Sequence, residues 1–205
     1  MARKIVNIEE LEALYLNKEP SSLARAKELD YINDSYQKFI EASPFCMLST
    51  FGEKGIDCTP RGDPAGFVRV VDKKTILLPD RKGNNRLDSM RNIVMNSQVG
   101  LIFLVPNVGE TVRVAGHAEI IVDDELNASF AMKGKPALSV LKITVDKIYF
   151  HCGKAFMRSN LWKPETYPDR KSVPSAGQMG KEIDRSFDGV AYDKALPERY
   201  KKTLY

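Results

Sequence analysis

The sequence predicts a single-domain, mainly β (α+β) protein with helices around its sheet. Short runs of β-forming residues recur from Phe45 onward, separated by turns rich in Gly, Asp and Lys. Helical spacing of apolar residues dominates before Phe45. The chain has 205 residues, of which 43% are hydrophobic, enough for one buried core. Several short strands at close spacing favour a closed barrel over an open parallel sheet.

Helices are predicted in the N-terminal segment, residues 7–43. Asn7 with Glu10 three residues later forms a capping-box pattern, so a helix is expected to start near Ile8. A second helical stretch is expected from about Ser22 to Ala42 and to stop before Pro44.

The predicted core covers about residues 44–162. Its short strands are Phe45–Thr50, Ile56–Thr59, Phe67–Val71 and Thr75–Leu78. A polar loop at 80–85 and a helix from Arg86 to about Met95 follow. Val99–Val105 and Thr111–Val122 are then expected to pair in antiparallel fashion, and Leu138–His151 forms a further long strand. Neither repeats nor an internal boundary divide the chain, and a tail at 163–205 is expected to pack loosely or on a partner.

Composition narrows the function classes. Lys and Arg number 31 against 27 Asp and Glu, and this excess of +4 suits a small anionic ligand better than a nucleic acid. The first 15 residues lack the apolar run of a signal peptide or membrane span. Cys46, Cys58 and Cys152 are widely spaced and form no CxxC pair, which argues against disulfides or a zinc site. A cytoplasmic protein without a metal is expected.

The segment Leu78–Asp88 is the strongest candidate for ligand binding. A strand ends there, a loop carrying Arg81, Lys82 and Arg86 follows, and a helix begins with Asn85 as the expected N-cap and Asp88 at N3. Free N–H groups at a helix start favour anions, and Arg86 can offer a planar fork to phosphate oxygens. The alternative is a solvated loop before an ordinary capped helix.

Two other segments carry candidate cations on strands. Arg61 follows a strand and is flanked by Pro60 and Gly62, so its guanidinium can reach the same anion; the alternative is a surface turn. Thr111 and Arg113 project from one face of a strand whose other face is apolar. Pairing of Arg113 with a local Glu is the alternative to ligand binding.

Together these segments resemble the pyridoxamine 5'-phosphate oxidase-like FMN-binding superfamily, and most closely a bacterial branch of FMN-dependent proteins. The motifs are a Pro-Arg-Gly-Asp turn at residues 60–63 and an Asp-Arg-Lys-Gly-Asn-Asn-Arg loop at residues 80–86. Supporting matches lie at residues 44–45, 96–103, 111–118, 151–155, 158–159 and 161–162. The resemblance covers roughly residues 20–165.

The resemblance implies a six-stranded split β-barrel and a homodimer with two FMN sites at its interface. Carried over residue by residue, Arg61, Asn85 and Arg86 contact the FMN phosphate, with Arg81 or Lys82 in support. Thr59 and the backbone of Pro79 and Asp80 flank the flavin ring, Thr111 approaches its polar edge, and Arg113 joins the binding set. Lys154 and Arg158 either stabilise charge on the reduced ring or lie on a polar face of the final helix.

The implied function is an FMN-dependent oxidoreductase that moves two electrons between a small organic substrate and a nicotinamide or other electron partner. No protein side chain is identified as a catalytic acid or base. Two departures weigh against vitamin B6 chemistry: Asn85-Arg86 stands where those oxidases carry Arg-Lys, and the Trp-and-Arg segment near their C-terminus has no counterpart here. The alternative is a non-catalytic flavin- or haem-binding module on the same barrel.

Overall fold

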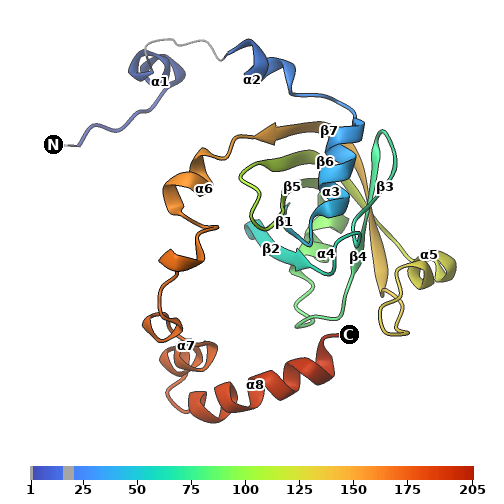
Figure 1. Ribbon diagram of the computed structural model, residues 1–205, viewed down its shortest axis with the longest axis vertical. Helices are drawn as coiled ribbons and strands as arrows, with labels where there is room; N and C mark the ends of the chain where they lie inside the picture. Colours follow the sequence, from blue (N-terminus) through green and yellow to red (C-terminus); the bar gives the residue numbers. More distant parts are fainter. Residues whose placement is uncertain (1, 16–20) are drawn as a thin grey trace.

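Seven strands form one sheet in the computed structural model, which describes residues 2–15 and 21–205 (Figure 1). Within the described residues, neighbouring strands pair in antiparallel fashion, in the order β2-β1-β5-β6-β7-β4-β3. The strands are β1 (Phe45–Gly52), β2 (Gly55–Gly62), β3 (Arg69–Asp72), β4 (Thr75–Asp80), β5 (Gln98–Leu104), β6 (Thr111–Ile121) and β7 (Ser139–His151).

The α+β class and each predicted strand are confirmed, whereas the count and closure of the barrel differ. The sheet has seven strands, one more than the resemblance implies, because the four-residue β3 pairs with β4 at one edge. Among the strands described, β2 and β3 are the two ends of the order and do not pair with each other. The sheet is therefore open.

The sheet nevertheless curls until its two ends approach. Arg61 of β2 and Asp80 of β4 form an ion pair of 3.0 Å, although β2 stands at one end of the sheet and β4 next to the other. These two strands are joined by polar side chains and not by backbone hydrogen bonds. We call this line of contact, marked by Arg61 and Asp80, the seam. The seam is where the candidate site lies.

The core fills the inside of the curl. Along β5, Val99, Leu101 and Phe103 point inward and alternate with half-buried residues, as period-two strands require. Helices α3 (Asp34–Ala42) and α4 (Asp88–Met95) cover the core with Ile40 and Ile93. The largest fully buried side chains are those of Phe103, Ile40, Leu48, Ile76, Leu78, Leu141, Ile143 and Ile148.

The N-terminal prediction is confirmed at its start and wrong in its middle. Asn7 caps α1 (Ile8–Leu14) by accepting from the Glu10 backbone N–H at 2.8 Å. The expected single helix over 22–42 is two helices, α2 (Ser22–Ala26) and α3. The break arises because Leu29 pairs with Ile148 through two backbone hydrogen bonds, a contact between distant parts of the chain. Residues 16–20 of the expected helical segment lie outside the described residues.

Beyond β6 the chain forms four more α-helices. They are α5 (Asp124–Ser129), α6 (Lys154–Ser159), α7 (Ala176–Ile183) and α8 (Gly189–Thr203), with 3-10 turns at Pro164–Thr166 and Arg170–Ser172. The expected loose tail is thus largely helical, and α7 packs on α8 where Gly177 meets Gly189. Figure 1 shows this segment leaving the sheet after α6 and returning to it at its C-terminal end. None of the helices in the described part of the chain is both long and apolar enough to cross a membrane.

Candidate cofactor site

A cavity of about 570 Å³ opens at the seam between the two ends of the sheet. It is bounded by β2, the end of β4, the loop that follows β4, and the first turn of α4. Six of the residues predicted to bind the cofactor line it: Thr59, Arg61, Asp80, Arg81, Asn85 and Arg86. The fold therefore brings together two motifs that lie apart in the sequence.

Arg61 reaches the cavity because β2 alternates. Asp57, Thr59 and Arg61 share the half-buried face of the strand, while the residues between them are exposed. Arg61 Nη1 donates to Asp80 Oδ1 at 3.0 Å. Its Nε atom is buried and has no hydrogen-bond partner within the described structure. An unsatisfied buried donor costs about 1–3 kcal/mol, so this N–H group is suited to an acceptor supplied by a ligand.

Asp80 balances the charge of Arg61 in a partly dehydrated position. Burial raises the pKa of the Asp80 carboxyl above its ordinary value of 3.8, and the Arg61 guanidinium opposes that rise. Its side chain is 13% exposed. Because both groups are largely withdrawn from water, their pairing is sensitive to any anion that enters the cavity.

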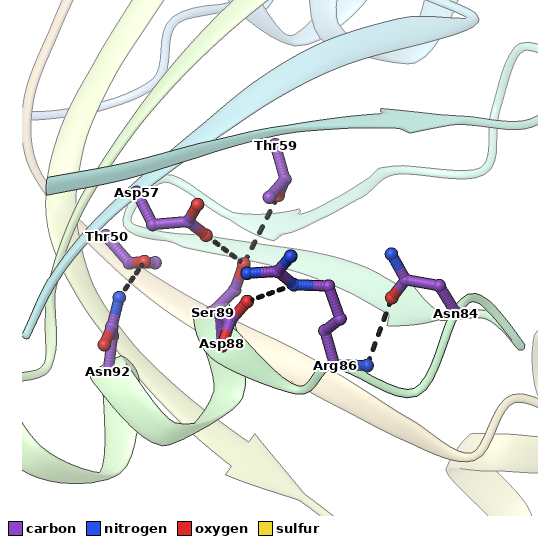
Figure 2. A network of polar contacts seen from close by, with 8 residues as sticks. All are labelled: Thr50, Asp57, Thr59, Asn84, Arg86, Asp88, Ser89 and Asn92. Atoms are coloured by element: carbon purple, nitrogen blue, oxygen red, sulfur yellow. Dashed lines mark hydrogen bonds and ion pairs between the residues drawn. The ribbon is translucent and has the colours of Figure 1, made fainter. Parts of the chain in front are cut away.

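Arg86 lies at the open side of the cavity. Its side chain is 75% exposed, and Nε donates to Asp88 Oδ2 at 2.7 Å (Figure 2). This hydrogen bond lowers the pKa of the Asp88 carboxyl, which therefore stays ionised and competes with a ligand for Arg86. The Arg86 backbone N–H donates to Asn84 Oδ1 at 3.1 Å.

The expected cap of α4 is wrong. Leu87, not Asn85, precedes the first turn, and no side chain caps the helix there. Asp88 is consequently the first helical residue rather than the third. Asn85 and Leu87 both have φ of 59°, in the left-handed region. Asn tolerates this region and forms the turn instead of the cap, whereas Leu adopts it at a cost of about 1–2 kcal/mol.

Sequence reasoning missed the hydroxyl and carboxylate groups that link β2 to α4. Ser89 Oγ donates to Asp57 Oδ2 at 3.2 Å and lies 3.3 Å from Thr59 Oγ1 (Figure 2). One turn further, Asn92 Nδ2 donates to Thr50 Oγ1 at 3.0 Å. Because side chains alternate along β2, Asp57 lies on the same face as Arg61, and this alternation could have predicted its place in the site. No sequence pattern pointed to Ser89.

The cavity lining carries balanced formal charge. Arg61, Arg81 and Arg86 face the carboxylates of Asp57, Asp80 and Asp88. A ligand anion is therefore attracted by directed N–H donors rather than by a net positive field.

The remaining candidates lie elsewhere. Thr111 and Arg113 line a second cavity of about 510 Å³ on the sheet, with His151 and with Ala155 and Phe156 of α6. The Arg113 guanidinium lies 5.2 Å from the centre of the Tyr149 ring. Four predicted contacts line neither cavity: Pro79, buried in β4; Lys82, exposed in the loop; and Lys154 and Arg158, on α6, which is not the final helix.

The protein is thus of the α+β class, with a curled antiparallel sheet and an arginine-lined cavity at its seam. The family model described as pyridoxamine 5'-phosphate oxidase matches residues 32–152, more than half of the chain. The chain belongs to this family. The match ends before α6, so the segment from α6 through α8 lies outside it.

Solved structures give weaker likenesses. HupZ of Group A Streptococcus is 21% identical, with 57% of this chain and 91% of that chain covered and a TM-score of 0.47. A putative pyridoxamine 5'-phosphate oxidase from Lactobacillus delbrueckii is 20% identical, with 60% and 98% covered and a TM-score of 0.47. An FMN-binding protein from Syntrophomonas wolfei is 12% identical, with 70% and 95% covered and a TM-score of 0.46. No curated protein matches the chain.

Proposed function

We propose that this protein binds FMN in the seam cavity and acts as an FMN-dependent oxidoreductase on a small organic substrate. The observation that carries the proposal is the buried Arg61 Nε without a hydrogen-bond partner in the described structure. A cavity of about 570 Å³ is within the usual range for cofactor sites. Family membership supports FMN as the anion, with the curled sheet serving as a split barrel.

The residues of the cavity fit a phosphate ester. Arg61 is suited to donate Nε to a phosphate oxygen while keeping its Nη1 bond to Asp80. Arg86 is exposed enough to turn from Asp88 toward the same anion. The uncapped first turn of α4 adds backbone N–H donors to this lining. FMN, when bound, supplies the two-electron chemistry, and a nicotinamide or another small molecule completes the electron exchange.

We further propose a homodimer whose two chains complete each site. Support comes from the separation of the expected contacts: Arg61 and Arg86 line one cavity of the chain, and Thr111 and Arg113 line another. In a two-fold dimer, residues of the second cavity can complete the partner's site. A cytoplasmic location remains part of the proposal and is supported by three free cysteines.

A binding comparison between FMN and riboflavin tests the proposal. Charge-assisted contacts contribute about 1.5–3 kcal/mol each, so loss of the phosphate should weaken binding at least about tenfold. Arg86→Ala should lower FMN affinity by a similar factor and leave riboflavin affinity unchanged. Arg91→Ala is the matched control, because Arg91 is an exposed arginine of α4 outside the cavity lining.

The readout is quenching of flavin fluorescence on titration with protein. Equal affinities for FMN and riboflavin would refute the phosphate site. Tight FMN binding without reduction by nicotinamides or turnover of small substrates would favour a non-catalytic flavin-binding module.

A further inference from the structure

A buried carboxylate connects the seam cavity to the end of α8. Asp63 follows β2, and its side chain is only 2% exposed. Arg81 Nε donates to its Oδ2 at 2.8 Å, and the Tyr205 hydroxyl donates to its Oδ1 at 2.6 Å. Both oxygens of one carboxylate are thus committed, one to the cavity loop and one to a residue 142 positions further along the chain.

These bonds fix the guanidinium of Arg81. Besides Nε to Asp63, its Nη1 donates to the Phe130 carbonyl at 2.6 Å, and the side chain is 19% exposed. Two of the five N–H donors of Arg81 are therefore used by the protein, and these two hydrogen bonds fix the plane of its guanidinium group. Arg81 also lines the seam cavity, so its orientation determines which donors a ligand meets there.

Tyr205 is itself held by two contacts with the turn between α5 and β7. Lys135 Nζ donates to the Tyr205 carbonyl, and Lys133 Nζ lies 5.2 Å from the centre of its ring. The hydrogen bond to Asp63 raises the pKa of the Tyr205 hydroxyl, which therefore remains a donor. Tyr205 lies outside the residues matched by the family model, so this contact is a feature of this chain's own C-terminal segment.

We propose that Tyr205 is a positioning residue for the anion site, acting through Asp63 on Arg81. The inference rests on the proposed function. Without the hydroxyl, Asp63 Oδ1 loses a partner in a dehydrated position, and the carboxylate is free to rotate toward the Arg81 guanidinium. That rotation draws the Arg81 guanidinium away from the cavity. Docking of the segment after α8 thereby sets the affinity of the site for its anion.

The test compares Tyr205→Phe with Tyr200→Phe, a control of the same chemistry on an exposed position of α8. Tyr205→Phe should weaken FMN binding about three- to tenfold, the range for loss of one hydrogen bond. Tyr200→Phe should bind as the wild type does. In an Arg81→Ala background, Tyr205→Phe should have no further effect, because the route through Arg81 is already removed.

A second readout is independent of FMN. The Nε–H resonance of Arg81 should shift in Tyr205→Phe relative to the wild type, because the Asp63 carboxylate that accepts from it has rotated, and it should stay unchanged in Tyr200→Phe. Failure of the wild type to bind FMN would defeat the proposed function, while this resonance would still decide the role of Tyr205. The inference is overturned if Tyr205→Phe retains both the wild-type Arg81 Nε–H resonance and wild-type affinity. A full additional loss in the Arg81→Ala background would overturn it as well.

Discussion

Asp80 shows how one side chain can couple anion binding to pH. Its carboxylate accepts from Arg61 at 3.0 Å inside the seam, where burial raises its pKa above 3.8. The folded protein therefore binds this proton more readily than the unfolded chain does. Taken alone, this group lowers stability as pH rises from 3.8 through the raised pKa.

Sulfate binding should consequently strengthen as pH falls from 7 toward the raised pKa of Asp80. Protonation removes the negative charge that competes for Arg61, while sulfate remains fully ionised over this range. The measurement is a sulfate titration followed by thermal unfolding at several pH values. Asp80→Asn should remove most of the dependence, and a variant that keeps the full dependence would assign it to another group.

At the same scale, motif matching predicts that Arg61 and Arg86 bind one anion, and the structure places both residues on the lining of the seam cavity. It did not predict that Asp80 pairs with Arg61 or that Asp88 pairs with Arg86. Strand alternation could have predicted the place of Asp57 on the cavity face of β2, but the contact of Asp63 with Tyr205 joins residues 142 positions apart and leaves no local pattern.

Helix α4 begins in a strained way at the edge of the cavity. Leu87 occupies the left-handed region with φ of 59° and offers no capping side chain, and it is 53% exposed. Strain of this kind gathers at ligand sites, where the surrounding structure imposes it.

Leu87→Asn should raise the free energy of unfolding by about 1 kcal/mol, because Asn tolerates positive φ and caps helices well. Denaturant unfolding of the apo-protein measures the change. Val94→Asn, at a position of α4 that is 78% exposed, is the control and should change stability little. A destabilised Leu87→Asn variant would contradict the strain described here.

Strand positions were predictable because burial on one face imposes period two, as in β5 and β6. Helix boundaries were less so. The break between α2 and α3 depends on Leu29 pairing with Ile148, and the packing of α7 on α8 depends on the meeting of Gly177 with Gly189. Both are contacts between separate elements, which local propensity does not encode.

For the whole molecule, the outer face of the sheet is the surface on which we expect two chains to meet. Met47, Ile102 and Leu104 lie half-buried on that face of β1 and β5, beside Phe45, which is 36% exposed. Apolar residues that gather on an open sheet face are typical of a protein interface.

The FMN-bound protein should therefore have twice the 23.1 kDa mass of the chain in light scattering, with one FMN per chain. Ile102→Asp should yield a monomer that has lost FMN, since a charge cannot be buried unpaired at the interface. Val122→Asp, at a position that is 73% exposed beyond the end of β6, should stay dimeric and yellow. A wild-type monomer that holds one FMN tightly would exclude the shared site.

The two free edges of the sheet bear on solubility. An unpaired edge strand is a template on which strands of other molecules add, and such growth leads to fibrils. Here β2 contains Pro60, which has no N–H to offer, and β3 is only four residues long with an irregular register between Val70 and Asp72. Both edges are poor templates. Even at the high concentrations of overexpression, addition of further strands along the sheet edges is therefore disfavoured.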